Sequence, residues 1–268
     1  MTATTQPAPA VFTGPGIPLS RLIKVELRKL VDTRASFWLA ASIAAISAII
    51  GVVVLIVGPG TSDPGPSGSP GTDGNITFAN LFDLMTAPMA FLLPVMAILL
   101  VTSEWSQRNA LTTFTMEPRR ERVIIAKLTV SVIASIAAVV IALALGALCN
   151  LIGGLIYSNG GVWSISASAL ISGLLNILVG VLIGFAFAAL LLNTPAAIVA
   201  YFVVPTVLEI IGAVVPWIND HLIDWIRLPM LESSPSGSDW AHFLAGCVIW
   251  FAVPLFFGVN RIMRSEVK

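Results

Sequence analysis

The sequence predicts an all-α membrane protein: six transmembrane helices, preceded by an amphipathic interfacial helix and with a short outer-face helix between spans five and six. Two observations support this fold class. Hydrophobic residues make up 57% of the 268 positions and charged residues only 10%, whereas a soluble domain carries about a quarter charged residues. The apolar residues also gather in six segments, each close to the ~20 residues that cross a bilayer core.

The N-terminal region divides into a tail and a helix. Residues 1–18 are rich in Thr, Pro, Ala and Gly, cannot bury enough apolar surface to fix a structure, and are expected to form a disordered tail. Residues 19–32 (LSRLIKVELRKLVD) place apolar side chains on one helical face and Arg21, Lys24 and Arg28 on the opposite face. This pattern is typical of a helix that lies in the membrane interface.

The six-span permease domain is expected to occupy residues 19–268. Its first apolar segment is too long for a signal peptide and lacks a small-x-small cleavage site, so we expect it to stay in the mature protein. The uncharged turn at 193–195 leaves open a broken re-entrant hairpin in place of spans four and five. The predicted spans lie at about 37–57, 84–102, 123–149, 170–192, 196–215 and 240–259.

The basic residues orient the chain. Of the 14 lysines and arginines, five precede the first span, five lie around the second connection and three follow the last span, which leaves Arg227 alone elsewhere. The positive-inside rule makes the side with these thirteen residues cytoplasmic. We therefore expect a multi-pass protein of the plasma membrane with both termini in the cytoplasm.

Two connections fall on the outer side of this topology. The first, 58–75, is rich in Gly, Pro and Ser and is predicted to be a flexible loop. The last contains PWINDHLIDWIRLPML, in which apolar and charged residues separate onto two faces of a helix. We predict a short helix on the outer leaflet, anchored by Trp217 and Trp225.

The sequence lacks the usual residues of an enzyme. None of its four lysines stands in a phosphate-binding P-loop, and His221 and His242 belong to no HExxH or GxSxG motif. Cys149 and Cys247 fall in apolar segments without metal-ligand spacing. We therefore expect no catalytic residue, no metal site, no cofactor and no nucleic-acid partner for this chain.

The second cytoplasmic connection is the richest segment in charged residues. Between Ser103 and Leu128 it reads SEWSQRNALTTFTMEPRRERVIIAKL, and residues 110–116 can form an amphipathic turn of helix. The connection can be a docking element for a cytoplasmic partner, or a solvated loop that follows the positive-inside rule.

Two motifs of the chain resemble type-2 ATP-binding-cassette (ABC) transporter permeases. The first is VELRKLVDTRASFWL before span one, and the second runs from Glu104 through Pro118 to Lys127 after span two. The resemblance implies an exporter membrane subunit that hydrolyses no ATP itself. Two copies, or this chain and a paralogue, would pair within membrane lipid and bind two ABC ATPase subunits that carry ATP and Mg.

The resemblance also implies that these ATPases dock against the connection between spans two and three. The substrate stays open, as does the choice between a homodimer and a heterodimer. The residues expected to couple the permease to the ATPase are Glu26, Glu104, Arg108, Thr112, Thr113, Glu117, Pro118, Arg119, Arg120 and Arg122.

Glu26 projects into the middle of the apolar face of the 19–32 helix, where a carboxylate needs a partner. One hypothesis is that it bonds to Arg108 or Arg119 of the cytoplasmic connection, or to the docked ATPase, and so couples ATP-driven movement to the spans. The alternative is a local pair with Lys29, which alone would stabilise the helix by only ~0.2–0.5 kcal/mol.

Glu209 lies within the fifth span, where a charged carboxylate is unfavourable unless it faces protein or water. It is a candidate for the substrate path, together with Asn176, or for a pair across the dimer. The alternative is a protonated helix-to-helix hydrogen bond, for example to Asn176. Glu209 also supports a rival function, a proton-coupled secondary transporter, although no inverted repeat is visible.

Small residues recur every fourth position in the fourth span and include a GxxxG motif at Gly180 and Gly184. Such a stripe lets two helices approach closely. It predicts helix packing, either within the chain or across a dimer.

Overall fold

The computed structural model describes residues 17–57, 77–106, 119–157, 161–231 and 237–264. The predicted disordered tail, apart from its last two residues, and the predicted outer loop at 58–75 lie outside this part of the chain. The described residues are almost entirely helical, and their β-structure is limited to one isolated bridge between Thr77 and Val162.

Six helical stretches of the described residues are long and apolar enough to cross a membrane, which confirms the predicted all-α fold with six spans. They are Arg34–Val57, Phe78–Trp105, Arg120–Ile156, Ala167–Leu191, Thr194–Val214 and Gly237–Arg264. The structure divides the described chain into α1 (Leu19–Asp32), α2 (Arg34–Val57), α3 (Phe78–Ser106), α5 (Arg120–Ile156), α6 (Ala167–Leu191), α7 (Thr194–Val214), α8 (Pro216–His221), α9 (Ile223–Ile226), α10 (Gly237–Cys247), η1 (Val248–Ala252) and α11 (Val253–Arg264).

All six spanning stretches are longer than the apolar segments that predict them, and α3 and α5 exceed their segments by the most. α3 begins at Phe78, six residues before the expected start at 84, and α5 extends over 37 residues in place of 123–149. At 1.5 Å per residue α5 is about 55 Å long, well beyond a ~30 Å hydrocarbon core. The added residues include a charged end at 120–122 but also the largely apolar stretch 150–156, so the end of the predicted segment did not mark the end of the helix.

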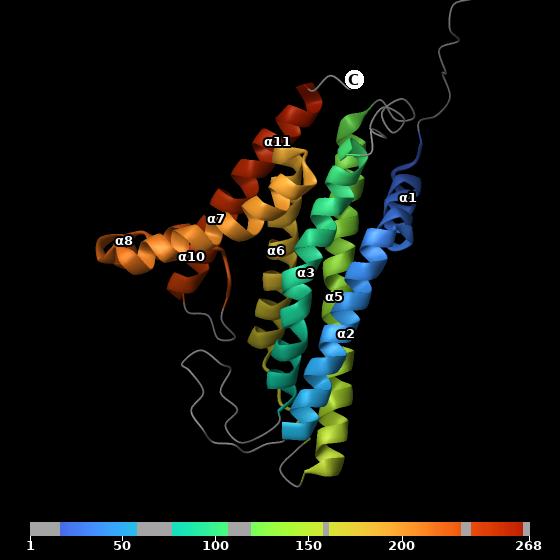
Figure 1. The fold of residues 1–268 in the computed structure, drawn as a ribbon, viewed down its shortest axis with the longest axis vertical. Helices are drawn as coiled ribbons and strands as arrows, with labels where there is room; N and C mark the ends of the chain where they lie inside the picture. Colours follow the sequence, from blue (N-terminus) through green and yellow to red (C-terminus); the bar gives the residue numbers. More distant parts are fainter. Residues whose placement is uncertain (1–16, 58–76, 107–118, 158–160, 232–236, 265–268) are drawn as a thin grey trace, which may run out of the picture.

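The helices form a bundle with one arm (Figure 1). α3 packs most extensively against α6 and α5, while α2 lies against α3 and α11 lies against α6. α7 slants away from this bundle, and α8 lies at its far end, to the left in the view. The end of α11 and α1 lie at the upper end of the bundle, opposite the lower ends of α2 and α5.

Apolar side chains of α3 and α6 fill the centre of the bundle. Phe82, Met85 and Ile98 of α3, with Ile183 and Phe185 of α6, are each no more than 1% exposed. Neighbouring helices cover α3 and α6 on several sides. Their apolar residues are therefore distributed around the helix instead of forming a single stripe.

The GxxxG motif of α6 packs inside the chain, against α3 at Pro94. Pro94 lies inside α3, and its side chain and carbonyl oxygen face α6. A Cβ atom built on Gly184 would lie 2.7 Å from the Pro94 carbonyl oxygen, whereas one built on Gly180 would meet its nearest atom at 3.4 Å. The missing side chain of Gly184 is therefore what allows α3 and α6 to cross.

A tight turn separates α6 from α7. Leu192 adopts a left-handed conformation with φ of 51°, and the Asn193 side chain accepts a hydrogen bond from the Ala196 backbone N–H at the start of α7. Thr102 of α3 and Thr194 of α7 hydrogen-bond through their hydroxyl groups at 2.7 Å. This contact fixes the first turn of α7 to the upper end of α3.

Two short helices occupy the stretch where the sequence predicts one outer helix. α8 ends at His221 and α9 begins at Ile223, because Leu222 has a non-helical backbone conformation (φ −122°, ψ −32°). Helix is present on both sides of Leu222, and the periodicity did not reveal the break at that residue.

A buried cluster of charged residues as the candidate functional site

Glu26 lies on the face of α1 that packs into the bundle. Leu22, Ile23 and Leu30 surround it at helical spacing and are half-buried or buried, while Leu27 and Val31 are exposed. The buried face of α1 is therefore centred on Glu26, as the sequence predicts, but it is narrower than the predicted apolar face. The Glu26 residue is only 4% exposed, so its charge depends on partners from other helices.

Lys127 of α5 supplies the principal partner. Its ammonium nitrogen Nζ lies 2.6 Å from Glu26 Oε2, 3.2 Å from Glu104 Oε1 and 2.9 Å from the carbonyl oxygen of Leu100. A protonated lysine has three N–H donors, and here three acceptors surround it. Lys127 is 5% exposed.

Lys29 completes the cluster on its solvent-exposed side. Its Nζ lies 2.7 Å from Glu26 Oε1 and 2.7 Å from Glu104 Oε1. Glu26 and Glu104 each contact both lysines, so the four side chains form a ring of alternating charge with no net charge. We call Glu26, Lys29, Glu104 and Lys127 the charged cluster.

The electrostatics of Lys29 follow from this arrangement. Partial burial works against its charged form, but the carboxylates of Glu104 and Glu26 outweigh that effect and hold the pKa of Lys29 above its ordinary value. The contribution of Lys29 to stability is therefore fully present at neutral pH, below its unfolded pKa, and is lost only as the pH rises through its folded pKa.

The charged cluster joins three helices at the two ends of one connection. Glu104 lies two residues before the end of α3, and Lys127 lies in the second turn of α5. Glu26 and Lys29 both belong to α1. Glu104 of α3 and Lys127 of α5, in the helices on either side of residues 107–118, are therefore both paired with side chains of α1.

The structure changes the expected partners of Glu26. The local pair with Lys29 is present, but the second partner is Lys127, 101 residues away. Arg119, one of the expected partners, is exposed just before α5. Lys127 was recognised only as part of a motif, although a lysine inside an apolar span is itself a signal for a buried acidic partner.

Five of the residues expected to couple the permease to an ATPase lie outside the described chain: Arg108, Thr112, Thr113, Glu117 and Pro118. Two others, Arg120 and Arg122, connect the first turn of α5 to other segments of the chain. Arg120 Nη1 donates to the carbonyl oxygen of Ile262 at 2.6 Å, near the end of α11, and Arg122 Nη2 donates to that of Ile17 at 2.6 Å. The last four carbonyl groups of a helix have no partner within the helix, so Arg120 caps α11.

The two residues expected along a substrate path do not meet. Asn176 forms two hydrogen bonds of 2.8 Å with the backbone N–H and carbonyl of Leu231. Glu209 lies on an exposed face of α7, and within the described residues it has no hydrogen bond or ion pair. The alternative hydrogen bond between Glu209 and Asn176 is therefore not present.

Comparison with known protein families finds one match. A family model described as ABC-2 family transporter protein matches residues 22–216, from α1 to the first residue of α8. The charged cluster lies within the matched part. No curated protein matches the chain.

Proposed function

The chain belongs to the ABC-2 transporter family and is a membrane permease of an ABC transporter, and from this premise we propose that it is an exporter subunit driven by a separate cytoplasmic ATPase. In this proposal the ATPase binds ATP and Mg, and the permease forms the path for the substrate. Both termini and the connection at 107–118 face the cytoplasm, where the ATPase docks.

The charged cluster is the observation that supports coupling to an ATPase. An ion pair between buried groups resists separation, because breaking it leaves an uncompensated charge inside the protein. Movement of the 107–118 connection is therefore transmitted to α1, α3 and α5 as one unit. A solvated loop would need no such attachment at both of its ends.

A second set of contacts extends this unit to the spans on the other side of the bundle. Arg120 caps the end of α11, and Arg261 of α11 donates from Nη1 to the carbonyl oxygen of Leu190 at the end of α6. Both contacts lie at the end of the bundle that carries the charged cluster. Displacement of the first turn of α5 thus reaches spans four and six.

We place the exposed face of α7 toward the substrate path and a second permease copy or paralogue. This face carries apolar side chains and Glu209. A charged side chain within a span is unfavourable when it faces lipid. A partner subunit and a hydrated path between the two subunits would remove that cost.

Replacing residues 110–118 with a Gly/Ser linker of equal length is expected to abolish binding of the partner ATPase. The replacement leaves Arg120 and Arg122 in place, because the structure assigns them to contacts within the permease. The measurement is copurification of the co-expressed ATPase with the tagged permease. Continued copurification at the wild-type ratio would refute docking at this connection.

Glu209→Gln is expected to change the rate of export several-fold while assembly with the ATPase and the second subunit stays normal. The amide keeps the size of the side chain but removes its charge. The measurement is substrate efflux from proteoliposomes that contain the complete transporter. Unchanged efflux for every tested substrate would remove Glu209 from the path, and efflux without the ATPase would favour the proton-coupled carrier instead.

A further inference from the structure

α1 has an exposed face opposite the charged cluster. The helix packs against α5, α2 and α3 and lies at the edge of the bundle, to the right in Figure 1. Because its buried face is narrow, Leu27 and Val31 remain 36% and 65% exposed although both are apolar. Arg21, Lys24 and Arg28 are also exposed, and we call these three residues the basic strip.

The apolar and basic side chains of this face are separated around the helix. At about 100° per residue, Val31 lies between Leu27 and Lys24, and Arg28 and Arg21 follow on the far side of Lys24. An apolar edge therefore borders the basic strip directly. This arrangement is typical of a helix in the plane of the membrane interface, with its apolar edge toward the acyl chains and its basic side chains among the headgroups.

An exposed tryptophan marks the depth of α1. Trp38 lies in the second turn of α2, which begins two residues after the end of α1. It is 69% exposed, and its ring makes an edge-to-face contact with Phe37 at a centroid distance of 5.9 Å. Tryptophans gather where a membrane span meets water. The exposed face of α1 therefore lies at the level of the lipid headgroups.

The basic strip has little compensating charge on its own face. Among the described residues, the side chains of Arg21 and Lys24 have no hydrogen bond or ion pair. Arg28 pairs with Asp32 at 3.1 Å, but both side chains are mostly exposed, and such a surface pair contributes little to stability. Three basic side chains and one carboxylate leave this face with a net charge of about +2.

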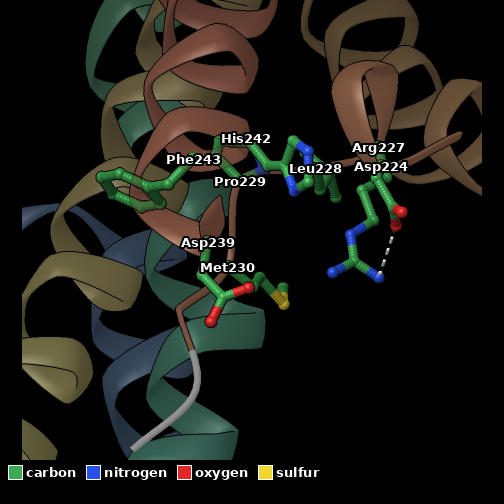
Figure 2. Close-up of a pocket in the computed structure, with 8 residues that line it drawn as sticks. All are labelled: Asp224, Arg227, Leu228, Pro229, Met230, Asp239, His242 and Phe243. Carbon is green, nitrogen blue, oxygen red and sulfur yellow. Dashed lines mark ion pairs between the residues drawn. The ribbon is translucent and has the colours of Figure 1, made fainter. Parts of the chain in front are cut away.

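The outer side of the chain provides a contrast (Figure 2). Arg227 is the one basic residue that the topology places there, and it pairs with Asp224 at 3.7 Å. Asp239 lines the same groove, so two carboxylates accompany one guanidinium group. A surface with an excess of positive charge is therefore a feature of the end that carries α1.

The charge of the basic strip selects its partner. The cytoplasmic leaflet carries anionic phospholipids, and their negative surface attracts basic side chains beside a membrane span. The apolar edge at Leu27 and Val31 suits the acyl chains of the same lipids. We propose that the exposed face of α1 binds the headgroups of anionic phospholipids in the cytoplasmic leaflet.

Lipid on this face holds the helix that supplies half of the charged cluster. Glu104 and Lys127 contact α1 from the bundle, and the lipid contacts it from the opposite side. The proposal rests on the proposed topology, which puts α1 on the cytoplasmic side, and is independent of a partner ATPase. A failure of lipid binding would leave ATPase docking at 107–118 untouched, and a failure of docking would leave lipid binding untouched.

The test is native mass spectrometry of the purified full-length permease, delipidated and then titrated with phosphatidylglycerol or with phosphatidylethanolamine. We expect phosphatidylglycerol, which is anionic, to bind more tightly than phosphatidylethanolamine, which is zwitterionic. Lys24→Gln should weaken binding of phosphatidylglycerol about fivefold, the effect of one basic side chain near an anionic membrane surface.

Asp32→Asn is expected to act in the opposite direction. Asp32 is the only carboxylate of α1 besides the buried Glu26, and its replacement releases Arg28 from the 3.1 Å ion pair. Phosphatidylglycerol should therefore bind several-fold more tightly to this variant. A variant that merely misfolded would not gain affinity, so the two opposite shifts separate binding from a general loss of structure.

Arg264→Gln is the matched control, because Arg264 is an exposed arginine at the same end of the bundle but on α11. It should bind phosphatidylglycerol as the wild type does. Equal weakening by Arg264→Gln and Lys24→Gln, or equal binding of the two lipids, would overturn a site on α1. Unchanged lipid binding by Lys24→Gln with loss of a copurifying ATPase would assign the face to the ATPase instead. Free glycerol phosphate that bound as tightly as the lipid would overturn the role of the apolar edge.

Discussion

Replacing Lys127 by methionine is expected to reduce folding stability by about 3–5 kcal/mol, the usual cost of breaking a buried ion pair. Methionine fills a similar volume, so the loss comes from the charge and not from a cavity. Without Lys127, Glu26 Oε2 loses its 2.6 Å contact and Glu104 Oε1 loses its contact at 3.2 Å. The measurement is the thermal midpoint and the yield of monodisperse protein in detergent.

Two further variants separate the buried pair from a general effect of charge. Lys24→Met removes an exposed lysine from α1 and should change the thermal midpoint little. The double variant Glu26→Gln with Lys127→Met should be more stable than the sum of the single losses predicts, by about 0.5–3 kcal/mol. Strict additivity would show that the two residues do not interact in the folded protein.

Gly184→Ala is expected to destabilise the protein by about 1–3 kcal/mol, because the added methyl group overpacks a close helix crossing. The new Cβ would lie 2.7 Å from the Pro94 carbonyl oxygen and 3.1 Å from the Pro94 Cβ. The first of these atoms belongs to the backbone, so α3 and α6 must move apart to make room. Thermal unfolding of the purified protein measures the loss.

Gly180→Ala is the matched control for this substitution. It changes the same residue type in the same helix and motif, but its Cβ would meet its nearest atoms at 3.4 and 3.7 Å, which is ordinary packing distance. We expect its thermal midpoint to stay close to that of the wild type. Equal losses for the two variants would contradict the crossing geometry at Pro94.

The charged cluster and the α3–α6 crossing have different roles in the proposed transport cycle. The crossing joins spans two and four by apolar contacts along their length, so it favours movement of the two helices as one body. The charged cluster lies at one end of that body and connects it to α1. In the proposed coupling, the ATPase therefore moves spans two and four together by acting at the end that carries the charged cluster.

The sequence was sufficient to predict where the helices lie, because helix formation depends on the properties of neighbouring residues. Runs of apolar residues predicted six spans, and the spacing of LSRLIKVELRKLVD predicted α1 with the bounds that the structure gives. The family was also recognised from short motifs, and the match over residues 22–216 confirms it. The limits of α3 and α5 were wrong, since the end of a predicted apolar segment does not mark the end of a helix.

The candidate site was only partly predictable. Glu26 was identified from its position on an apolar face, and Glu104 from a motif. The pair of Glu26 with Lys29 was one of the stated alternatives, whereas its contact with Lys127 was not foreseen. Arg108, another expected partner, lies outside the described residues. The GxxxG motif predicted close packing of helices without distinguishing Gly180 from Gly184. Asn176 was assigned to a substrate path, while the structure shows it holding the backbone of Leu231.

The sequence by itself determined that this chain is a bundle of membrane-spanning helices with an amphipathic helix in front, because hydrophobicity and helical periodicity are properties of neighbouring residues. Only the tertiary structure decided which charges meet. Glu26 and Lys127 are 101 residues apart, and their contact depends on how α1 and α5 pack. Several lysines and arginines would satisfy a buried carboxylate equally well, so the choice among them is made by the packing of the apolar helix faces around it.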